Sequence, residues 1–319
     1  MSASGGAAWV ISPALKTIAH KIKKKINWGR AFVVSIPTVW LAVFFLVPFI
    51  VVFKISIATT EIAQPPYSAL LDWDAEEAIA SFKVNFGNYL FLLEDTLYID
   101  AYWSSIKIAA VSTFFTLLIA YPMAYMIARS APSYRPVLLA LVILPFWTSF
   151  LLRVYAWMGF LKKDGVINNV LLNLGIIDQP LTIMNTDAAV YIGIVYTYLP
   201  FMILPLYTTL EKLDGTLLEA AADLGAKSWE TFIYVTLPLS VPGIVAGCML
   251  VFIPAVGEFV IPALLGGSET LMIGRVLWDE FFLNRDWPMA SAVAIVMLLF
   301  LVLPIMLFRN AQGNKGEEY

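Results

Sequence analysis

Apolar residues in this sequence gather into six long stretches, and most polar residues are confined to the segments between them. A helix needs about 20 apolar residues to cross the hydrocarbon core of a bilayer, and stretches of about 18 or more are candidates. The pattern therefore predicts six membrane-spanning helices. They cover residues 31–53, 103–128, 136–158, 188–210, 241–265 and 288–308.

The composition argues for a membrane protein and against a soluble one. Hydrophobic residues make up 60% of the 319 residues and charged residues 13%, with a mean hydropathy of +0.81. Soluble domains contain about 45–50% apolar residues and about 25% charged residues. One cysteine, Cys248, and one histidine, His20, exclude a disulfide framework and leave almost no material for zinc or triad chemistry. The net charge of −3 predicts no nucleic-acid partner. We expect an all-α transmembrane domain, residues 31–308, between tails 1–30 and 309–319.

The basic residues predict the orientation of this domain, because short cytoplasmic segments are enriched in lysine and arginine. The first tail is strongly basic, which places the N-terminus in the cytoplasm against anionic membrane lipids, and six spans place the C-terminus there too. A cleaved signal peptide is the alternative, but the segment 31–53 exceeds the roughly 7–15 residues of a signal core. The basic residues of the tail are Lys16, Lys21, Lys23, Lys24, Lys25 and Arg30.

The first outer loop, residues 54–102, is acidic and rich in aromatic residues. Disordered linkers are poor in aromatic residues, so we predict an ordered lid containing short helices. Its acidity would attract a cationic ligand or a basic partner surface; a solvated outer face is the plainer interpretation.

The inner loop, residues 211–238, is long and its sequence favours helices. Residues 217–224 are strong helix formers with one apolar stripe. Gly225 suits the position after a helix end that requires a positive φ. A second amphipathic helix is predicted over 228–236 with Ser228 as its cap, and Pro238 is predicted to mark the turn back into the membrane.

The same loop resembles the EAA signature of the membrane subunits of bacterial ABC importers, in which E-A-A, three residues, G and nine residues precede I-x-L-P. The resemblance implies a type I-like ABC importer fold in which this loop is a coupling helix that docks on an ATPase subunit, with Glu219 bonded to a basic group there. The matching residues are Glu219, Ala220, Ala221, Gly225, Leu237 and Pro238, with Val235 in place of isoleucine.

Further segments resemble the polyamine branch of these permeases, closest to its putrescine type, and the resemblance extends over about residues 36–304. It implies an inner-membrane importer with a second homologous permease, an ATPase dimer that binds ATP and Mg, and an extracytoplasmic polyamine-binding protein. The chain has no G-x-x-x-x-G-K-[ST] phosphate loop, so we expect no cofactor and no enzymatic activity in this subunit. The similar segments are 144–157, 251–262, 264–267 and 272–278.

Two ionisable residues fall deep within predicted spans, where charges are functional candidates. At 1.5 Å per residue, Arg153 and Glu258 each lie about 25 Å from the inner end of their helix. One interpretation is an intramembrane ion pair. The other is that Glu258 meets an ammonium group of the substrate, with aromatic rings supplying cation–π contacts. The first candidates for these rings are Trp147, Tyr155 and Trp157, with Tyr191, Tyr196 and Tyr198 behind them.

Asp279 and Glu280 lie in the predicted outer loop between spans five and six, beside Trp278, Phe281 and Phe282. Carboxylates beside aromatic faces suit a linear diamine, although the same mixture suits a lid at the membrane surface. An acid–base couple is disfavoured because adjacent residues on a helix point about 100° apart.

These observations favour the permease subunit of an ABC importer for putrescine or spermidine. An ABC permease for another small solute is the first alternative, because the EAA loop indicates an ATPase partner and does not indicate which solute is transported. An ion-coupled secondary transporter would carry an inverted repeat, and none is evident. An intramembrane enzyme would need convergent histidine, cysteine or metal ligands.

Overall fold

The computed structural model describes residues 28–74 and 79–313. The predicted basic tail therefore lies almost entirely outside the described residues, as do the last six residues of the chain. Two compact units are distinguished, Met1–Lys54 and Ile55–Tyr319, and each is described by itself.

The first unit contains the first predicted span. Helix α2 (Trp28–Leu41) continues through the π-helical turn η1 (Ala42–Leu46) into α3 (Val47–Ser56). The apolar stretch Phe32–Ser56 has a mean hydropathy of 2.5, so a helix at 31–53 is confirmed. The π-helical turn ends two residues before Pro48, which has no N–H to donate to the preceding turn.

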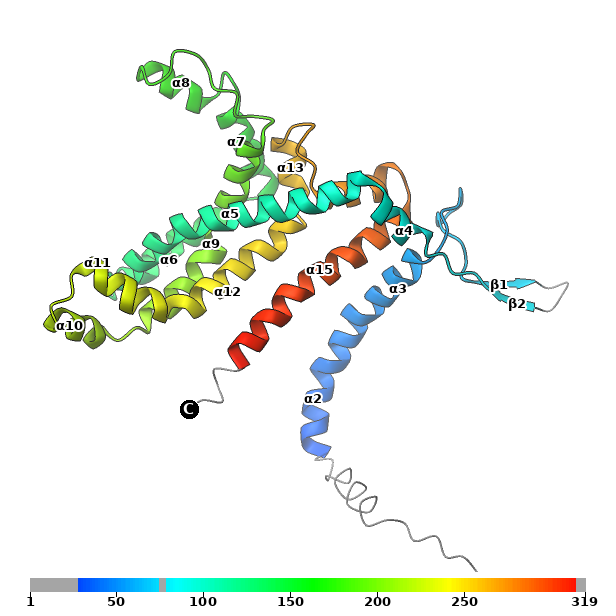
Figure 1. Ribbon diagram of the computed structural model, residues 1–319, viewed down its shortest axis with the longest axis horizontal. Helices are drawn as coiled ribbons and strands as arrows, with labels where there is room; N and C mark the ends of the chain where they lie inside the picture. The colour runs from blue at the N-terminus through cyan, green and yellow to red at the C-terminus, as the bar shows by residue number, and fades with distance from the viewer. Residues whose placement is uncertain (1–27, 75–78, 314–319) are drawn as a thin grey trace, which may run out of the picture. The chain divides into compact units, whose positions relative to one another are not determined.

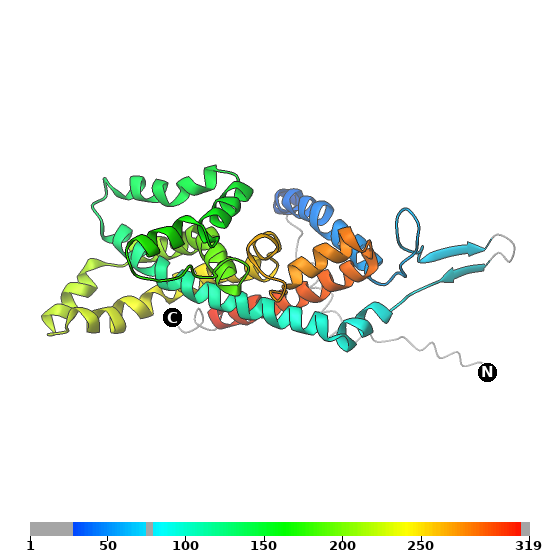
Figure 2. The same cartoon turned by 90° about the horizontal axis from the view of Figure 1, so that it is seen from above.

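The second unit is built on three long helices, α5 (Thr96–Arg129), α9 (Asp187–Glu211) and α12 (Leu237–Val256), which pack against one another (Figures 1 and 2). Small residues let these backbones approach, as in other membrane helix pairs. A Cβ atom at Gly243 would lie 2.6 Å from Oγ1 of Thr209, and one at Gly247 would lie 2.6 Å from Sδ of Met202. This Gly-x-x-x-Gly pair seats α12 on α9.

The third predicted span is interrupted. It consists of α6 (Arg135–Ile143), the 3₁₀ turn η2 (Leu144–Trp147), α7 (Phe150–Leu161) and α8 (Val166–Asn173), with a bend of 89° after η2. Thr148 and Ser149 are extended at the bend. A continuous helix over 136–158 is therefore wrong. Pro145, which cannot donate a backbone hydrogen bond, lies where α6 changes to the 3₁₀ turn η2.

The fifth predicted span is shifted toward the inner loop, residues 211–238. One continuous helix runs from α11 (Ser228–Thr231) through the π-helical turn η3 (Phe232–Thr236) into α12 and ends at Val256. Helix α13 (Val260–Leu265) follows as a separate piece. The predicted helix 241–265 is wrong at both ends, because Gly257–Phe259 break it before Leu265.

The remaining spans correspond to described helices. The predictions at 103–128 and 188–210 are confirmed by α5 and α9, and the last by α15 (Trp287–Gly313), which is apolar over Trp287–Val302. Four described helices are long and apolar enough to cross a membrane, or five when the bent pair counts as one span. The count of six stays a prediction.

The outer segment after the first span is ordered in its described part but is not purely helical. Strands β1 (Leu71–Asp74) and β2 (Ile79–Phe82) form an antiparallel hairpin, followed by α4 (Gly87–Glu94). The amide of Asn88 donates to the carbonyls of Ser56 and Ala58 at 2.9 and 3.0 Å. The prediction of short helices in this segment is thus confirmed for α4 and wrong for the hairpin, and its role as a lid stays a prediction.

Candidate functional site: a coupling loop and an interrupted membrane helix

The first helix of the inner loop, α10 (Gly215–Asp223), begins at a carboxylate cap. Asp214 Oδ1 accepts a hydrogen bond from the Thr216 N–H at 3.0 Å, and this bond to the charged form holds the pKa of Asp214 below its ordinary value. The EAA residues Glu219, Ala220 and Ala221 all lie on α10, with Glu219 and Ala220 exposed. The structure therefore presents the motif's carboxylate to solvent.

Gly225 ends α10 as predicted. Its φ of +84° lies in the left-handed region. The Gly225 N–H donates to the Ala222 carbonyl at 2.9 Å, and the Ala226 N–H donates to the Ala221 carbonyl at 3.0 Å. These two bonds form a Schellman motif, which satisfies the last carbonyls of the helix and reverses the chain.

The second helix of the loop differs from the prediction in two ways. Lys227, not Ser228, is its cap residue, and Glu230 Oε2 accepts from the Lys227 N–H at 2.7 Å. Pro238 marks no turn, because the π-helical turn η3 lets the Leu237 N–H reach the Phe232 carbonyl and the helix continues. Leu237 is half-buried and Pro238 is exposed. The last residues of the motif therefore lie within one continuous apolar helix, Ser228–Val256.

The loop leaves large apolar side chains uncovered in the isolated chain. Leu224 is 88% exposed and Tyr234 is 74% exposed, and Trp229 is also exposed. Several large apolar side chains exposed on one short segment are typical of a docking site.

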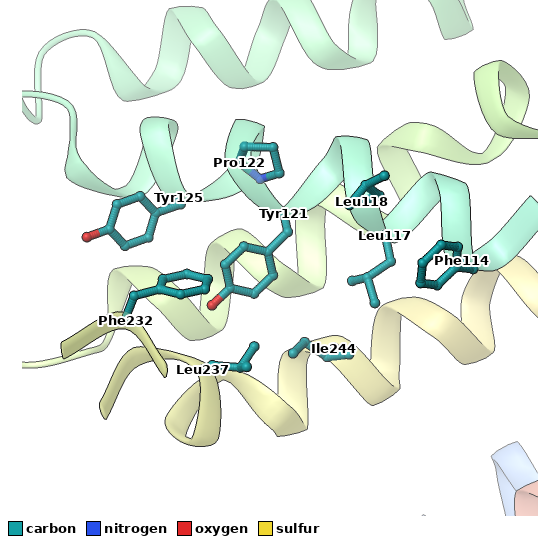
Figure 3. A pocket seen from close by; sticks show the side chains of 9 residues that line it. All are labelled: Phe114, Leu117, Leu118, Tyr121, Pro122, Tyr125, Phe232, Leu237 and Ile244. Carbon is teal, nitrogen blue, oxygen red and sulfur yellow. The ribbon is translucent and has the colours of Figure 1, made fainter. Parts of the chain in front are cut away.

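Behind the loop, an apolar pocket of about 700 Å³ separates α5 from the helix that leaves the loop. Figure 3 shows Tyr121 reaching from α5 toward Phe232 and Leu237. The Tyr121 ring meets Phe232 edge-on at 5.5 Å, and its hydroxyl hydrogen-bonds with the Ser240 hydroxyl at 2.9 Å. A residue of the EAA motif, Leu237, thus lines the contact between the loop and the membrane helices.

The break after α12 holds Glu258 in a fully satisfied position. Its side chain is 8% exposed. Oε2 accepts from the Tyr198 hydroxyl at 2.7 Å, and Oε1 accepts from the Val260 and Ile261 N–H groups at 3.1 and 3.4 Å. Glu258 therefore caps α13, where a negative charge faces unpaired backbone donors.

Arg153 does not pair with Glu258. In the described part of the chain its Nε and Nη1 are buried without a hydrogen-bond partner, and its guanidinium lies 4.8 Å from the Phe146 ring. The Phe146 ring meets Phe201 at 5.2 Å, and Phe201 meets Tyr198 at 6.1 Å. The predicted ion pair is wrong in this conformation, because Tyr198 and the α13 backbone already satisfy the carboxylate and aromatic rings lie beside the guanidinium.

Close backbone packing fixes the break. A Cβ atom at Gly274 would lie 2.4 Å from the Gly257 carbonyl oxygen and 2.7 Å from that of Glu258. One residue earlier, the Ile273 N–H donates to Oγ of the buried Ser105 at 2.7 Å. Helix α14 (Ile273–Trp278) is thus held between the break and α5.

The candidate aromatic residues are not gathered around Glu258. Trp147 is 81% exposed and Tyr155 is also exposed. Trp157 meets Tyr196 edge-on at 5.3 Å and lines a pocket of about 500 Å³ that also includes Tyr191. Of the six rings proposed from the sequence, Tyr198 is the one that hydrogen-bonds to the carboxylate.

A row of aromatic rings leads from the break toward the outer segment; the sequence analysis named Trp278 and Phe282 in it but not Phe259 or the stacking. Phe259, directly after Glu258, stacks on Trp278 at 4.5 Å, and Trp278 meets Phe282 at 4.1 Å. The row passes the π-helical turn η4 (Asp279–Leu283). The available signal was the adjacency of Phe259 to Glu258.

The two outer carboxylates occupy different positions beside this row. Glu280 accepts from the Tyr98 hydroxyl at 2.9 Å and from the Asn284 amide at 3.0 Å. Asp279 Oδ2 lies 4.0 Å from Nε of Arg275. Glu280 is therefore anchored to α5, while Asp279 is balanced by a cation on its own helix.

The fold defines a helical membrane component with a long helical loop that exposes apolar side chains and an interrupted helix within its core. Residues 112–313 match the family described as "Binding-protein-dependent transport system inner membrane component". The chain belongs to this family, which confirms the assignment made from the EAA motif.

Relatives and solved structures agree with this membership. The chain is 41% identical over 297 residues to the spermidine/putrescine transport system permease protein PotB of Haemophilus influenzae, covering 93% of this chain and 96% of that protein. It is 40% identical over 281 residues to PotB of Escherichia coli, covering 88% of this chain and 97% of that protein. The fold is similar to a chain of a bacterial alginate ABC transporter, with a TM-score of 0.64, 17% identity and coverage of 95% and 99%. A type I-like permease fold is therefore confirmed.

Proposed function

We propose that this chain is the permease subunit of an ATP-driven importer of polyamines, spermidine or putrescine. The observation that carries the proposal is the identity of about 41% over 93% of the chain to a protein named for spermidine and putrescine transport. Polyamines are flexible cations, so their passage calls for carboxylates and aromatic faces within the membrane.

The inner loop supplies the coupling. In this proposal α10 and α11 dock on an ATPase dimer that binds ATP and Mg, and Glu219, exposed on α10, bonds to a basic group there. The continuous helix from Ser228 to Val256 carries the resulting motion to the break at Glu258, as a rigid lever would. Both chain termini then lie in the cytoplasm.

The break and the outer aromatic row supply the route. An extracytoplasmic binding protein would release the amine near Asp279 and Glu280, and the stacked rings of Phe259 and Trp278 lead from there to Glu258. Glu258 is the innermost acceptor of an ammonium group, which would replace the hydrogen bond from Tyr198.

A second homologous permease completes the path. Trp147 and Tyr155, whose side chains are exposed in the isolated chain, stay candidates for contacts on the face toward that subunit, and Trp157 lies behind them. The exposed apolar surface of the first span is suited to lipid.

The proposal is tested by reconstituting the complete importer in liposomes with ATP on the cytoplasmic side. We expect labelled spermidine or putrescine to enter only with the loaded binding protein and ATP. Uptake of a different small solute in preference to both amines would contradict the assignment of polyamines as the substrate. Amine uptake driven by an ion gradient without ATP would contradict the assignment to ATP-driven importers.

A further inference from the structure

One ion pair fastens the broken third span to the start of the inner loop. Arg135, the first residue of α6, places Nη1 3.1 Å from Oε1 of Glu211, the last residue of α9. Its Nε donates to the carbonyl of Ser130, directly after α5, at 2.9 Å. One guanidinium thus joins the ends of three helices.

The pair of Arg135 and Glu211 lies between the inner loop and the bend of the third span. Only three residues, 212–214, separate Glu211 from α10, so a displacement of α10 is passed along the chain directly to Glu211. On the other side, Arg135 begins the helix that leads to the 89° bend. Helix α7, beyond the bend, packs against α13 next to Glu258.

The Tyr207 hydroxyl of α9 also interacts with both Arg135 and Glu211, and the surrounding packing is apolar. Leu138, Leu139 and Val142 are partly buried against the cluster around Leu206. Apolar contacts are non-directional and permit sliding, whereas a charge-assisted bond to a guanidinium fixes distance and orientation. The Arg135 and Glu211 side chains are 25% and 39% exposed, so the pair adds little to stability and its effect lies in alignment.

We propose that Arg135 and Glu211 are positioning residues that transmit movement of the coupling loop to α6 and through it to the bend and the substrate route. This inference rests on the proposed function. It predicts that breaking the pair separates ATP hydrolysis from import while the importer still assembles and hydrolyses ATP.

The test uses the complete reconstituted importer and measures amine molecules imported per ATP hydrolysed. We expect Arg135→Gln and Glu211→Gln each to lower this ratio about two- to fivefold, the size of effect that a partly exposed pair supports. The reversed pair, Arg135→Glu with Glu211→Arg, is expected to restore it. Arg129→Gln is the matched control, because Arg129 lies in the same inner connection with its guanidinium 5.7 Å from the Tyr125 ring centroid, and among the described residues it forms no ion pair.

A purely structural role would lower assembly or total activity without changing the ratio. Unchanged ratios in both single variants would overturn the proposal. So would failure of the reversed pair to restore the ratio, because the effect would then belong to the individual charges. If the wild-type importer takes up no amine, the proposed function fails and the role of the pair with it, an outcome distinct from altered variants in a working importer.

Discussion

The inner loop, residues 211–238, and the break at Glu258 are both places where a helix ends, and they are held in different ways. Helix α10 ends through bonds between residues three to five apart, with Gly225 in the left-handed region. The break is held by Tyr198, Ser105 and Gly274, each on a segment distant in sequence. The first region is thus locally determined and suited to move as a unit, whereas the second depends on the packed bundle.

The strongest way to break this comparison is to change the local determinant, Gly225. A β-branched residue at a φ of +84° is strained by about 1–3 kcal/mol. We expect Gly225→Val to reshape the loop and lower ATP-dependent uptake at least about tenfold. Gly175→Val is the matched control, since Gly175 ends α8 with a φ of +67° outside the coupling loop. Equal losses in both variants would show that strain alone, and not the loop, causes the defect.

A smaller effect is expected at the break. Glu258→Gln keeps an oxygen for the Val260 and Ile261 N–H groups but removes the charge that an ammonium group would meet. Loss of a hydrogen bond to a charged group corresponds to about 1.5–3 kcal/mol, so we expect uptake to fall about tenfold or more, mainly through a higher KM. Glu269→Gln, at an exposed outer position, is the control. Unchanged kinetics in Glu258→Gln would leave Glu258 only its capping role.

Stability measurements sharpen the contrast without any transport assay. Gly274→Ala places a Cβ atom 2.4 Å from a backbone oxygen, and we expect a loss of about 1 kcal/mol or more in thermal unfolding. Gly159→Ala, where a Cβ atom meets nothing within 4 Å, is expected to be neutral or stabilising. Similar unfolding of the two variants would contradict the tight packing at the break.

The smallest effect concerns pH at the beginning of α10. The pKa of Asp214 is lowered in the folded loop, so its capping contribution is present above its ordinary pKa and is lost as the pH falls through the lowered value. A spin label at Leu217→Cys should become more mobile on acidification, and Asp214→Asn should abolish that dependence while keeping the cap. A label whose mobility does not change with pH would contradict this role.

The same difference explains what the sequence could predict. Most of the inner loop could be predicted residue by residue, because caps and the glycine turn depend on near neighbours. The helix cap lies one residue before the predicted Ser228, and the helix continues through Pro238 because of the π-helical turn η3. The break could not be predicted, because residues 257–259 lie within a long apolar stretch, 241–265, that looks like one helix. In addition, Tyr198, which hydrogen-bonds to Glu258, lies 60 residues away on α9. Hydropathy reports burial in lipid and says little about which side chains meet.

The central claim, that the inner loop is the ATPase contact, is tested most directly by labelling single cysteines with a water-soluble maleimide in a Cys248→Ala background. Leu224→Cys reports the loop, and Leu283→Cys, at a position 73% exposed on η4, reports the other end of the unit. Without the binding protein, addition of the ATPase should protect position 224 strongly and leave position 283 unchanged. Equal labelling of position 224 with and without the ATPase would contradict the account.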